Sequence, residues 1–202
     1  MKTFFILTVF VIFSGVNNDN NLQYLRNIGC EEIPPMTNLD SKRYFSGTWY
    51  GMYSQYGKPT SVCKTLKMTL KSDGTLNNEV YGYSLTKENK PKFASIHCNG
   101  SENDTKGKYT LICEKVNDNK DKKKHPVTFD GVVLVTDYDS FSIVHQCLSN
   151  GTIKLGTFLV LGRKSDDYTI QDTVKKILDP LDIKFDLFQS REKVDCKKHP
   201  DE

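Results

Sequence analysis

Six cysteines are the residues of this 202-residue chain whose chemistry is easiest to assign. They are Cys30, Cys63, Cys98, Cys113, Cys147 and Cys196, and none belongs to a C-x-x-C pair. Near its start the chain has Lys2 and then an apolar stretch, residues 4–16, which is typical of a signal-peptide core and short for a membrane span. In an exported chain an even number of cysteines favours disulfides over metal ligation. We therefore expect three disulfides and no metal site, with any of 15 pairings open.

The other reactive side chains do not form a catalytic pattern. Ser140 and Asp137 fall in an expected turn, whereas His145 falls in the middle of an expected strand. Nothing around the serine resembles a nucleophile elbow. The net charge is +3, which falls to about +2 when Lys2 is removed with the signal, and this is too small to indicate a nucleic-acid partner. We expect a binding protein and not an enzyme.

The elements that position these residues begin after the signal. We assign residues 1–18 to the signal peptide, with cleavage between 16 and 23, and residues 19–202 to one domain. An uncleaved membrane anchor is the alternative. No other long apolar run follows, so we expect a secreted, soluble monomer without membrane contact. Three sequons, at Asn99, Asn103 and Asn150, are expected surface glycosylation sites.

Eight short runs with β-like composition follow one another at close spacing, separated by loops rich in Gly, Asn, Asp and Lys. They are 48–56, 61–71, 75–85, 91–98, 108–116, 127–137, 140–148 and 155–161. Such a series without an intervening helix predicts an all-β fold, an up-and-down antiparallel barrel that leaves no exposed edge. From Asp166 the apolar period becomes helical until Pro180, which predicts one helix on the outside of the barrel. Alternating apolar residues at 181–187 then predict one short added strand.

Three motifs in this order resemble the conserved blocks of lipocalins. They are Gly47-Thr-Trp49 at the first strand, Thr136-Asp137-Tyr138 between the sixth and seventh strands, and Arg163 after the eighth. The resemblance implies that the tryptophan closes the barrel floor and that the arginine lies across its face. A guanidinium over an indole contributes about 0.5–2 kcal/mol.

Longer stretches are similar to the triabin-, pallidipin- and nitrophorin-like salivary lipocalins of blood-feeding bugs. They are YFSGTWY at 44–50, SIVHQC at 142–147, FLVLGR at 158–163 and SREKVDC at 190–196. The resemblance runs from about Cys30 to Cys196. It implies the pairs Cys30–Cys147 and Cys63–Cys196, which leaves Cys98–Cys113.

The same resemblance raises the question of haem, which nitrophorins carry on a histidine of the third strand. In this chain the matching stretch is Val80-Tyr-Gly82-Tyr83, so Gly82 occupies the position of that ligand. Glycine has no side chain that could coordinate iron. We therefore expect no haem and no other cofactor.

The interior of the barrel is the expected binding site, because eight strands leave room for one small ligand. Cys147 must point outward to reach a segment outside the barrel, and alternation then sets the phase of its strand. The inward positions expected on strands one, three, seven and eight are Trp49, Gly51, Tyr53, Gln55; Val80, Gly82, Ser84; Ser142, Val144, Gln146, Leu148; and Thr157, Leu159, Leu161. Tyr53, Gly82, Ser84, Val144, Gln146, Leu148, Thr157 and Leu159 are the candidate ligand contacts.

This mixed lining suits a small amphipathic host molecule such as an eicosanoid, a biogenic amine or a nucleotide. No inward acid emerges from these strands, which argues against an amine, and no inward Lys or Arg cluster emerges, which argues against a nucleotide. We expect an anti-haemostatic lipocalin that inhibits platelet aggregation by sequestering a thromboxane-like agonist. The alternative is an inhibitor that binds a host haemostatic protein, a protease of coagulation or contact activation, through its loops.

Overall fold

The computed structural model describes residues 30, 32–86, 88, 90–116, 126–149 and 154–198. The expected signal peptide and the sequon at Asn150 lie outside the described residues, as does the side chain of Ser84. Within these ranges no helix is long and apolar enough to cross a membrane.

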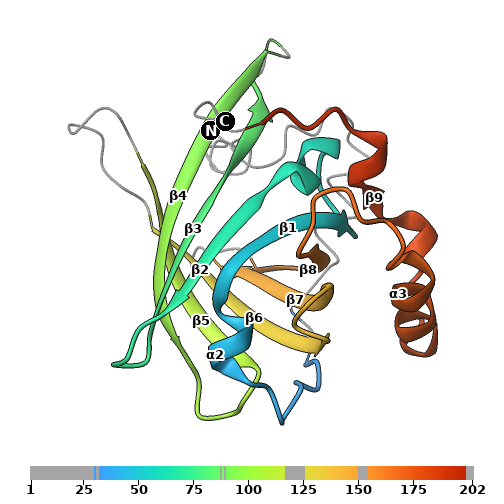
Figure 1. Ribbon diagram of the computed structural model, residues 1–202. Helices are drawn as coiled ribbons and strands as arrows, with labels where there is room; N and C mark the ends of the chain where they lie inside the picture. Colours follow the sequence, from blue (N-terminus) through green and yellow to red (C-terminus); the bar gives the residue numbers. More distant parts are fainter. Residues whose placement is uncertain are drawn as a thin grey trace, which may run out of the picture.

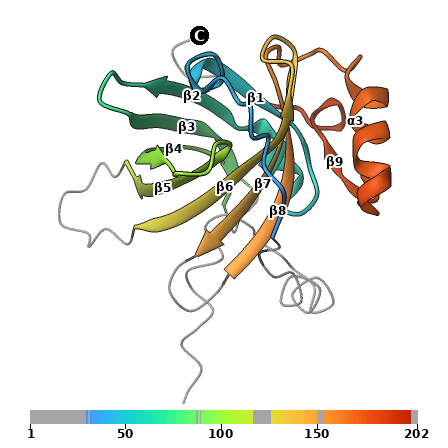
Figure 2. The same cartoon turned by 90° about the horizontal axis from the view of Figure 1, so that it is seen from below.

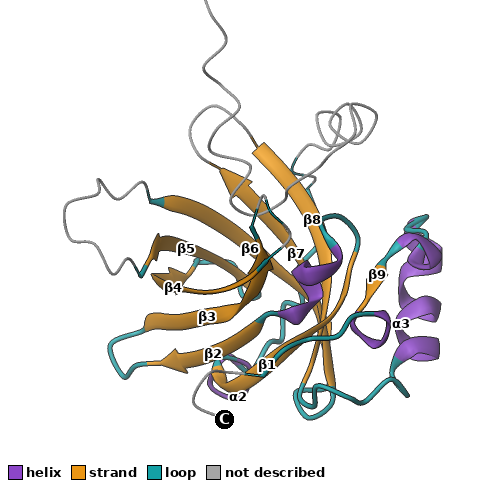
Figure 3. Cartoon of the chain, turned by 90° about the horizontal axis from the view of Figure 1, so that it is seen from above, coloured by secondary structure: helices purple, strands orange, loops and turns teal. Residues whose placement is uncertain are grey.

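Eight antiparallel strands form one closed barrel (Figure 1). They are β1 (Ser46–Ser54), β2 (Thr65–Leu70), β3 (Thr75–Leu85), β4 (Pro91–Glu102), β5 (Lys108–Lys115), β6 (Val127–Thr136), β7 (Phe141–Ser149) and β8 (Lys154–Gly162). Each strand pairs with the next, and β1 closes the ring because it pairs with both β2 and β8. Figures 2 and 3 look along the barrel and show this ring from its two ends. The predicted all-β, up-and-down barrel is confirmed.

The strand boundaries differ most from prediction around β2. The chain forms a short 3-10 helix, η2 (Pro59–Cys63), where the sequence predicted the start of a strand at residue 61. Proline at the first position of η2 has the φ angle of a helix and needs no N–H partner there. Strand β4 continues to Glu102, four residues beyond the predicted end.

The two ends of the barrel differ. We call the end with the β1–β2, β3–β4, β5–β6 and β7–β8 connections the mouth, and the other end the floor. A single helical turn, α2 (Ser41–Tyr44), lies at the floor (Figure 1). Asp40 caps it by accepting hydrogen bonds from the backbone N–H groups of Lys42 and Arg43.

Buried apolar residues form two clusters, one on each side of the barrel wall. The inner cluster fills the lower barrel with Tyr44, Phe45, Trp49, Met68, Leu76, Tyr109, Leu111, Val133, Val144, Leu161 and their neighbours. The outer cluster packs the wall against helix α3 (Gln171–Leu178) through Met52, Ile143, Phe158, Val160, Val174, Leu178 and others. The helix runs along the outside of the ring beside β1 and β8 (Figures 2 and 3), so the predicted outer helix is confirmed.

The prediction that Tyr53 points into the barrel is wrong. The register of β1 against β8 shifts between Gly51 and Tyr53, which places Met52 in a bulge and turns Tyr53 to the outer face. The Tyr53 ring packs there on Phe185, with ring centroids 4.9 Å apart. A bulge reverses the in-and-out alternation of the side chains that follow it. The side-chain directions in the first half of β1 therefore do not predict those in its second half.

The predicted added strand at 181–187 is also wrong. That stretch forms two 3-10 turns, η3 (Asp179–Leu181) and η4 (Phe185–Leu187), and a two-residue strand, β9 (Gln189–Ser190), follows and pairs with β1. Asp182 has a left-handed φ of 56°, which bends the chain between the two turns. Phe185 faces the outer cluster because of this bend.

Three disulfides cross-link the described residues, and two of them fasten segments outside the barrel. They join Cys30 to Cys147, Cys63 to Cys196, and Cys98 to Cys113. These are the pairs that the family resemblance implies. Cys63–Cys196 ties the C-terminal tail to η2 at the mouth, and Cys98–Cys113 crosses between β4 and β5.

Candidate ligand-binding site

The floor of the barrel is closed by aromatic rings that pack edge-on or tilted against one another, under one arginine. Trp49 is fully buried, and the Arg163 guanidinium carbon lies 3.7 Å from the centre of its ring. The guanidinium also donates to the carbonyl oxygens of Tyr138, Ser46, Thr48 and Arg43 at 2.7–3.1 Å. Because five of its interactions converge here, Arg163 joins α2, β1 and the β6–β7 turn into one closed end.

The other floor motifs build backbone turns. Gly47 has a left-handed φ of 69°, and a Cβ there would approach the Arg163 guanidinium to 3.6 Å. Thr136 donates to the Phe141 carbonyl and accepts from the Tyr138 N–H. The Asp137 carboxylate accepts from the N–H groups of residues 139–141 and from the Ser140 hydroxyl. Burial alone would raise the pKa of Asp137, but these bonds outweigh it and lower the pKa.

Ser140 and Asp137 therefore belong to a turn. His145 lies mid-strand on β7, and its ring packs on Phe158 at 4.8 Å on the outer face of the wall. The structure does not join these three side chains into a catalytic triad.

The interior changes character between floor and mouth. Below, inward residues such as Trp49, Val133 and Val144 have no exposed surface. Nearer the mouth, the inward side chains are only partly buried; these are Val80, Ala94, Phe129, Gln146, Leu148, Thr157 and Leu159. Of the expected ligand contacts, Gln146, Leu148, Thr157 and Leu159 thus lie on the half-exposed upper wall, whereas Val144 lies in the sealed core.

Polar side chains also lie deep in this interior, among them Tyr109 and Asn78. Tyr109 lies against Gly131, where a Cβ would come within 2.1 Å of the ring, and its hydroxyl hydrogen-bonds Gln146. Burial raises the pKa of Tyr109 to about 12, so the phenol is neutral at physiological pH. Asn78 on β3 is 4% exposed between Met68 and Cys98, and its Oδ1 atom has no hydrogen-bond partner among the described residues.

Lysines also lie on the inner face near the mouth, on segments whose inward positions were not predicted from the sequence. Lys64 follows η2 with extended backbone angles, which puts it on the same inward face as Leu66. Lys92 and Lys115 share the inward face of β4 and β5 with Ile96, which pairs directly with Lys115. Burial lowers the pKa of Lys64, and the charge of Lys115 lowers it further. The pKa of Lys115 is lowered by burial and by Lys92.

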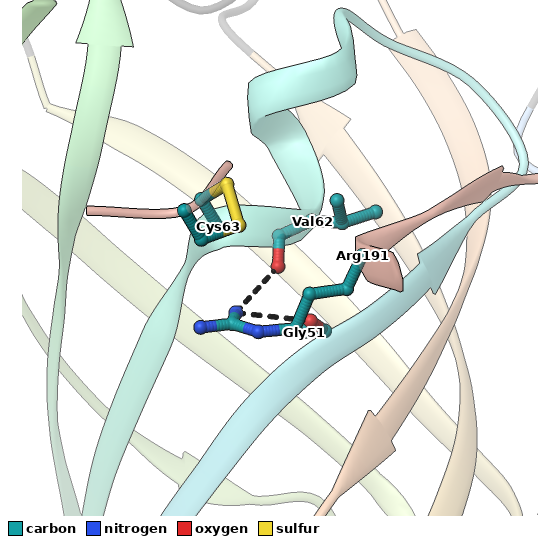
Figure 4. Close-up of a disulfide and its surroundings, with 5 residues drawn as sticks. Gly51, Val62, Cys63 and Arg191 are labelled. Atoms are coloured by element: carbon teal, nitrogen blue, oxygen red, sulfur yellow. Dashed lines mark hydrogen bonds between the residues drawn. A yellow bond between two sulfur atoms is a disulfide. The ribbon is translucent and has the colours of Figure 1, made fainter. Parts of the chain in front are cut away.

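The C-terminal tail fixes the position of η2 at this mouth (Figure 4). Arg191 donates to the carbonyl oxygens of Val62 at 2.8 Å and Gly51 at 3.3 Å, beside the Cys63–Cys196 disulfide. On the other side, Gly82 lets η2 approach β3, because a Cβ there would lie 2.5 Å from the Cys63 carbonyl oxygen. Arg191 is thus a positioning residue for the mouth.

The described residues do not fit haem. The position that would carry the ligand is Gly82, and the Cys63 backbone occupies the space where its side chain would begin. Among the histidines within the described ranges, His97 is exposed on the outer face of β4, and His145 packs in the outer cluster. His125 and His199 lie outside the described residues.

These features define a class of protein. A closed, eight-stranded antiparallel barrel with a Trp–Arg floor and one helix after the last barrel strand is a lipocalin. A solved structure titled as a biogenic amine-binding protein shares this fold, with a TM-score of 0.70, 17% identity, and coverage of 85% of this chain and 92% of that one. The leukotriene C4 complex of a protein named LTBP1 superposes with a TM-score of 0.52 at 22% identity, covering 78% of this chain and 93% of that one.

The family can be stated more narrowly. The nitrophorin family model matches residues 30–202, so this chain belongs to the nitrophorin family. It is similar to pallidipin of the bug Meccus pallidipennis, with 30% identity over 169 residues, which span 83% of this chain and 87% of pallidipin.

Sequence reasoning missed four residues that shape this site: Lys64, Lys115, Asn78 and Arg191. Asn78 lies on β3, Lys115 lies on β5, and Lys64 directly precedes β2. Alternation could have assigned these three residues to the inner face if the direction of each strand's side chains had been set from its buried residues. Arg191 gave no such signal, because its partners are backbone carbonyls far away in the sequence.

Proposed function

We propose that this protein is a secreted salivary lipocalin that sequesters a small amphipathic host molecule and thereby inhibits platelet aggregation, with a thromboxane-like eicosanoid as its ligand. It acts by binding and not by catalysis. The observation that carries the proposal is the contrast within the barrel. The floor half is sealed, whereas the mouth half presents partly exposed apolar and polar side chains, as a ligand contact surface requires.

The fold alone does not select the ligand, because the two solved neighbours are titled for an amine and for a leukotriene. The chain's own residues favour an acid over an amine. The inward residues of the upper wall that the structure describes include lysines and no aspartate or glutamate, and an amine would need a carboxylate partner.

Calorimetric titration tests this proposal with a stable thromboxane analogue, serotonin, ADP and hemin as separate ligands. We expect the thromboxane analogue to bind with a Kd below about 10 μM and the protein to block aggregation that this analogue triggers. If none of the four binds below that value, sequestration is abandoned and a protein target becomes the better hypothesis.

A cavity-filling variant links binding to the barrel interior. Ala94→Trp adds a large ring to the upper wall, and we expect at least a tenfold loss of affinity for the analogue. His97→Trp is the matched control, because this position lies three residues along the same strand on the exposed outer face. Gly82→Trp is unsuitable, since its side chain would displace η2. Unchanged binding by Ala94→Trp would show that the ligand lies elsewhere.

A further inference from the structure

One buried polar side chain on the inner wall has no hydrogen-bond partner within the described structure. Asn78 on β3 lies between Leu76 and Val80, which both belong to the inner cluster, so by alternation its side chain faces the interior. It is 4% exposed, and its Oδ1 atom is the unpartnered one. A buried acceptor without a donor destabilises a folded protein, so an amide at this position calls for a physical reason.

Among the described residues that surround Asn78 on the inner face, none has a side chain that could supply the missing donor. Asn78 pairs directly with Met68 of β2 and with Cys98 of β4, whose side chains are about 5 Å away. The Met68 thioether has no hydrogen to donate, and the Cys98 sulfur is bonded to Cys113. The remaining inward neighbours are apolar: Leu66, Leu70, Leu76, Val80, Ile96 and Gly100.

Backbone groups do not replace these side chains, because the N–H groups of paired strands bond within the sheet and not toward the interior. A donor can therefore reach the Asn78 Oδ1 atom only from a molecule inside the barrel.

The depth of Asn78 suits such a molecule. Strand β3 runs from the floor to the mouth, and Leu76, one inward position below Asn78, has no exposed surface. Val80, one inward position above, is only partly buried. Asn78 thus lies where the sealed floor half meets the mouth half, and the innermost group of a molecule in the mouth half would lie beside it.

The surroundings favour a neutral donor over a charged one. An ammonium group at this depth would need a carboxylate to balance its charge, and the sulfur and hydrocarbon neighbours of Asn78 offer none. A hydroxyl group supplies a donor without a net charge.

We propose that the barrel recognises a hydroxyl group at the inner end of an amphipathic ligand. This hydroxyl donates to the Asn78 Oδ1 atom, between Met68 and the Cys98–Cys113 disulfide. The inference rests on the proposed function, since it requires a small molecule in the barrel. It adds the group by which that molecule is recognised and the depth that this group reaches.

Two isomers test the donor by calorimetric titration: 1-nonanol and methyl octyl ether, of which only the alcohol can donate a hydrogen bond. We expect the unmodified protein to bind the alcohol about fivefold more tightly than the ether. Asn78→Leu should abolish this preference by weakening the binding of the alcohol. Asn77→Leu is the matched control, because Asn77 is the preceding residue of β3 and faces outward, and it should keep the preference. Nonylamine, a charged donor, should bind at least tenfold more weakly than the alcohol.

Thermal unfolding without ligand gives an independent measurement. Asn78→Leu replaces an unpartnered acceptor by an apolar side chain of similar size, so we expect Tm to rise by about 2–4 °C. Asn77→Leu should leave Tm nearly unchanged. A residue that stabilises the fold would give a fall in Tm instead, so a rise in Tm together with loss of the preference for the alcohol distinguishes a binding role from a structural one.

The outcomes separate the two proposals. If the unmodified protein binds the isomers equally, if neither isomer binds, or if Asn78→Leu keeps the preference, recognition by Asn78 is refuted while sequestration still stands on the thromboxane titration. If Tm of Asn78→Leu falls, the amide has a structural partner such as an ordered water, and the inference is refuted. If nonylamine binds as tightly as 1-nonanol, the preference for a neutral group is refuted. If no isomer binds and the thromboxane analogue also fails, both proposals fall.

Discussion

Replacing Arg163 by alanine should destabilise the barrel strongly, because this side chain joins three segments at the floor. Two of its four hydrogen bonds, to the Ser46 and Arg43 carbonyls, are exposed, so water can replace them. The bonds to Tyr138 and Thr48 are partly buried. At about 1.5 kcal/mol for each partly buried bond and about 1 kcal/mol for the contact with the Trp49 ring, the loss is ~4 kcal/mol.

For a domain of this size, that loss corresponds to a fall in Tm of about 10 °C. Guanidinium chloride unfolding measures it directly, with the disulfides kept oxidised. Trp49 is the only tryptophan and is fully buried, so its fluorescence reports the floor, while far-ultraviolet circular dichroism reports the strands. Arg163→Lys keeps the charge but not the planar fork, and it should recover about half of the loss.

Arg43→Ala is the matched control at the same end of the barrel. Arg43 also lies over an aromatic ring, 4.4 Å from the centre of Tyr138, and pairs with Asp139 at 2.9 Å. Its side chain is 51% exposed and that of Asp139 82%, so its removal should cost less than about 1 kcal/mol. If Arg163→Ala costs no more than Arg43→Ala, the reasoning that the floor depends on Arg163 is refuted.

Two further predictions concern the surface of the barrel. Burial alone would raise the pKa of Glu102, but bonds from Lys106, Ser41 and the Gly107 N–H lower it. Its contribution to stability is therefore present above the ordinary pKa of 4.5 and is lost as pH falls through the lower folded value. In an acid titration followed by circular dichroism, Glu102→Gln should lose less stability on acidification than the unmodified protein does. If the variant and the unmodified protein lose stability equally as the pH falls, the prediction is contradicted. Asn99 and Asn103 are exposed, so protein secreted from insect cells should lose mass with peptide N-glycosidase, and no shift contradicts glycosylation.

Much of the fold follows from local patterns in the sequence. Short alternating runs with turn residues between them predicted eight strands, and the change to a helical period predicted α3, because these features depend on neighbouring residues. Gly47, Trp49 and Arg163 could be assigned to the floor by resemblance. The tail was mispredicted, because apolar residues at 181–187 alternate as in a strand while the bend at Asp182 and contact with the outer cluster produce 3-10 turns.

The binding surface depended on contacts that only the tertiary structure decides. The bulge at Met52 moved Tyr53 from the interior to the outer face, because one extra residue in a strand reverses the direction of the next side chain. Lys64 and Lys115 are 51 residues apart in the sequence, and they lie at the same end of the barrel only because strands β2 to β5 pair side by side, which brings the start of β2 and the end of β5 to the mouth. The sequence by itself thus determined a lipocalin barrel with a closed floor, whereas the charge at its mouth is a product of strand register and closure.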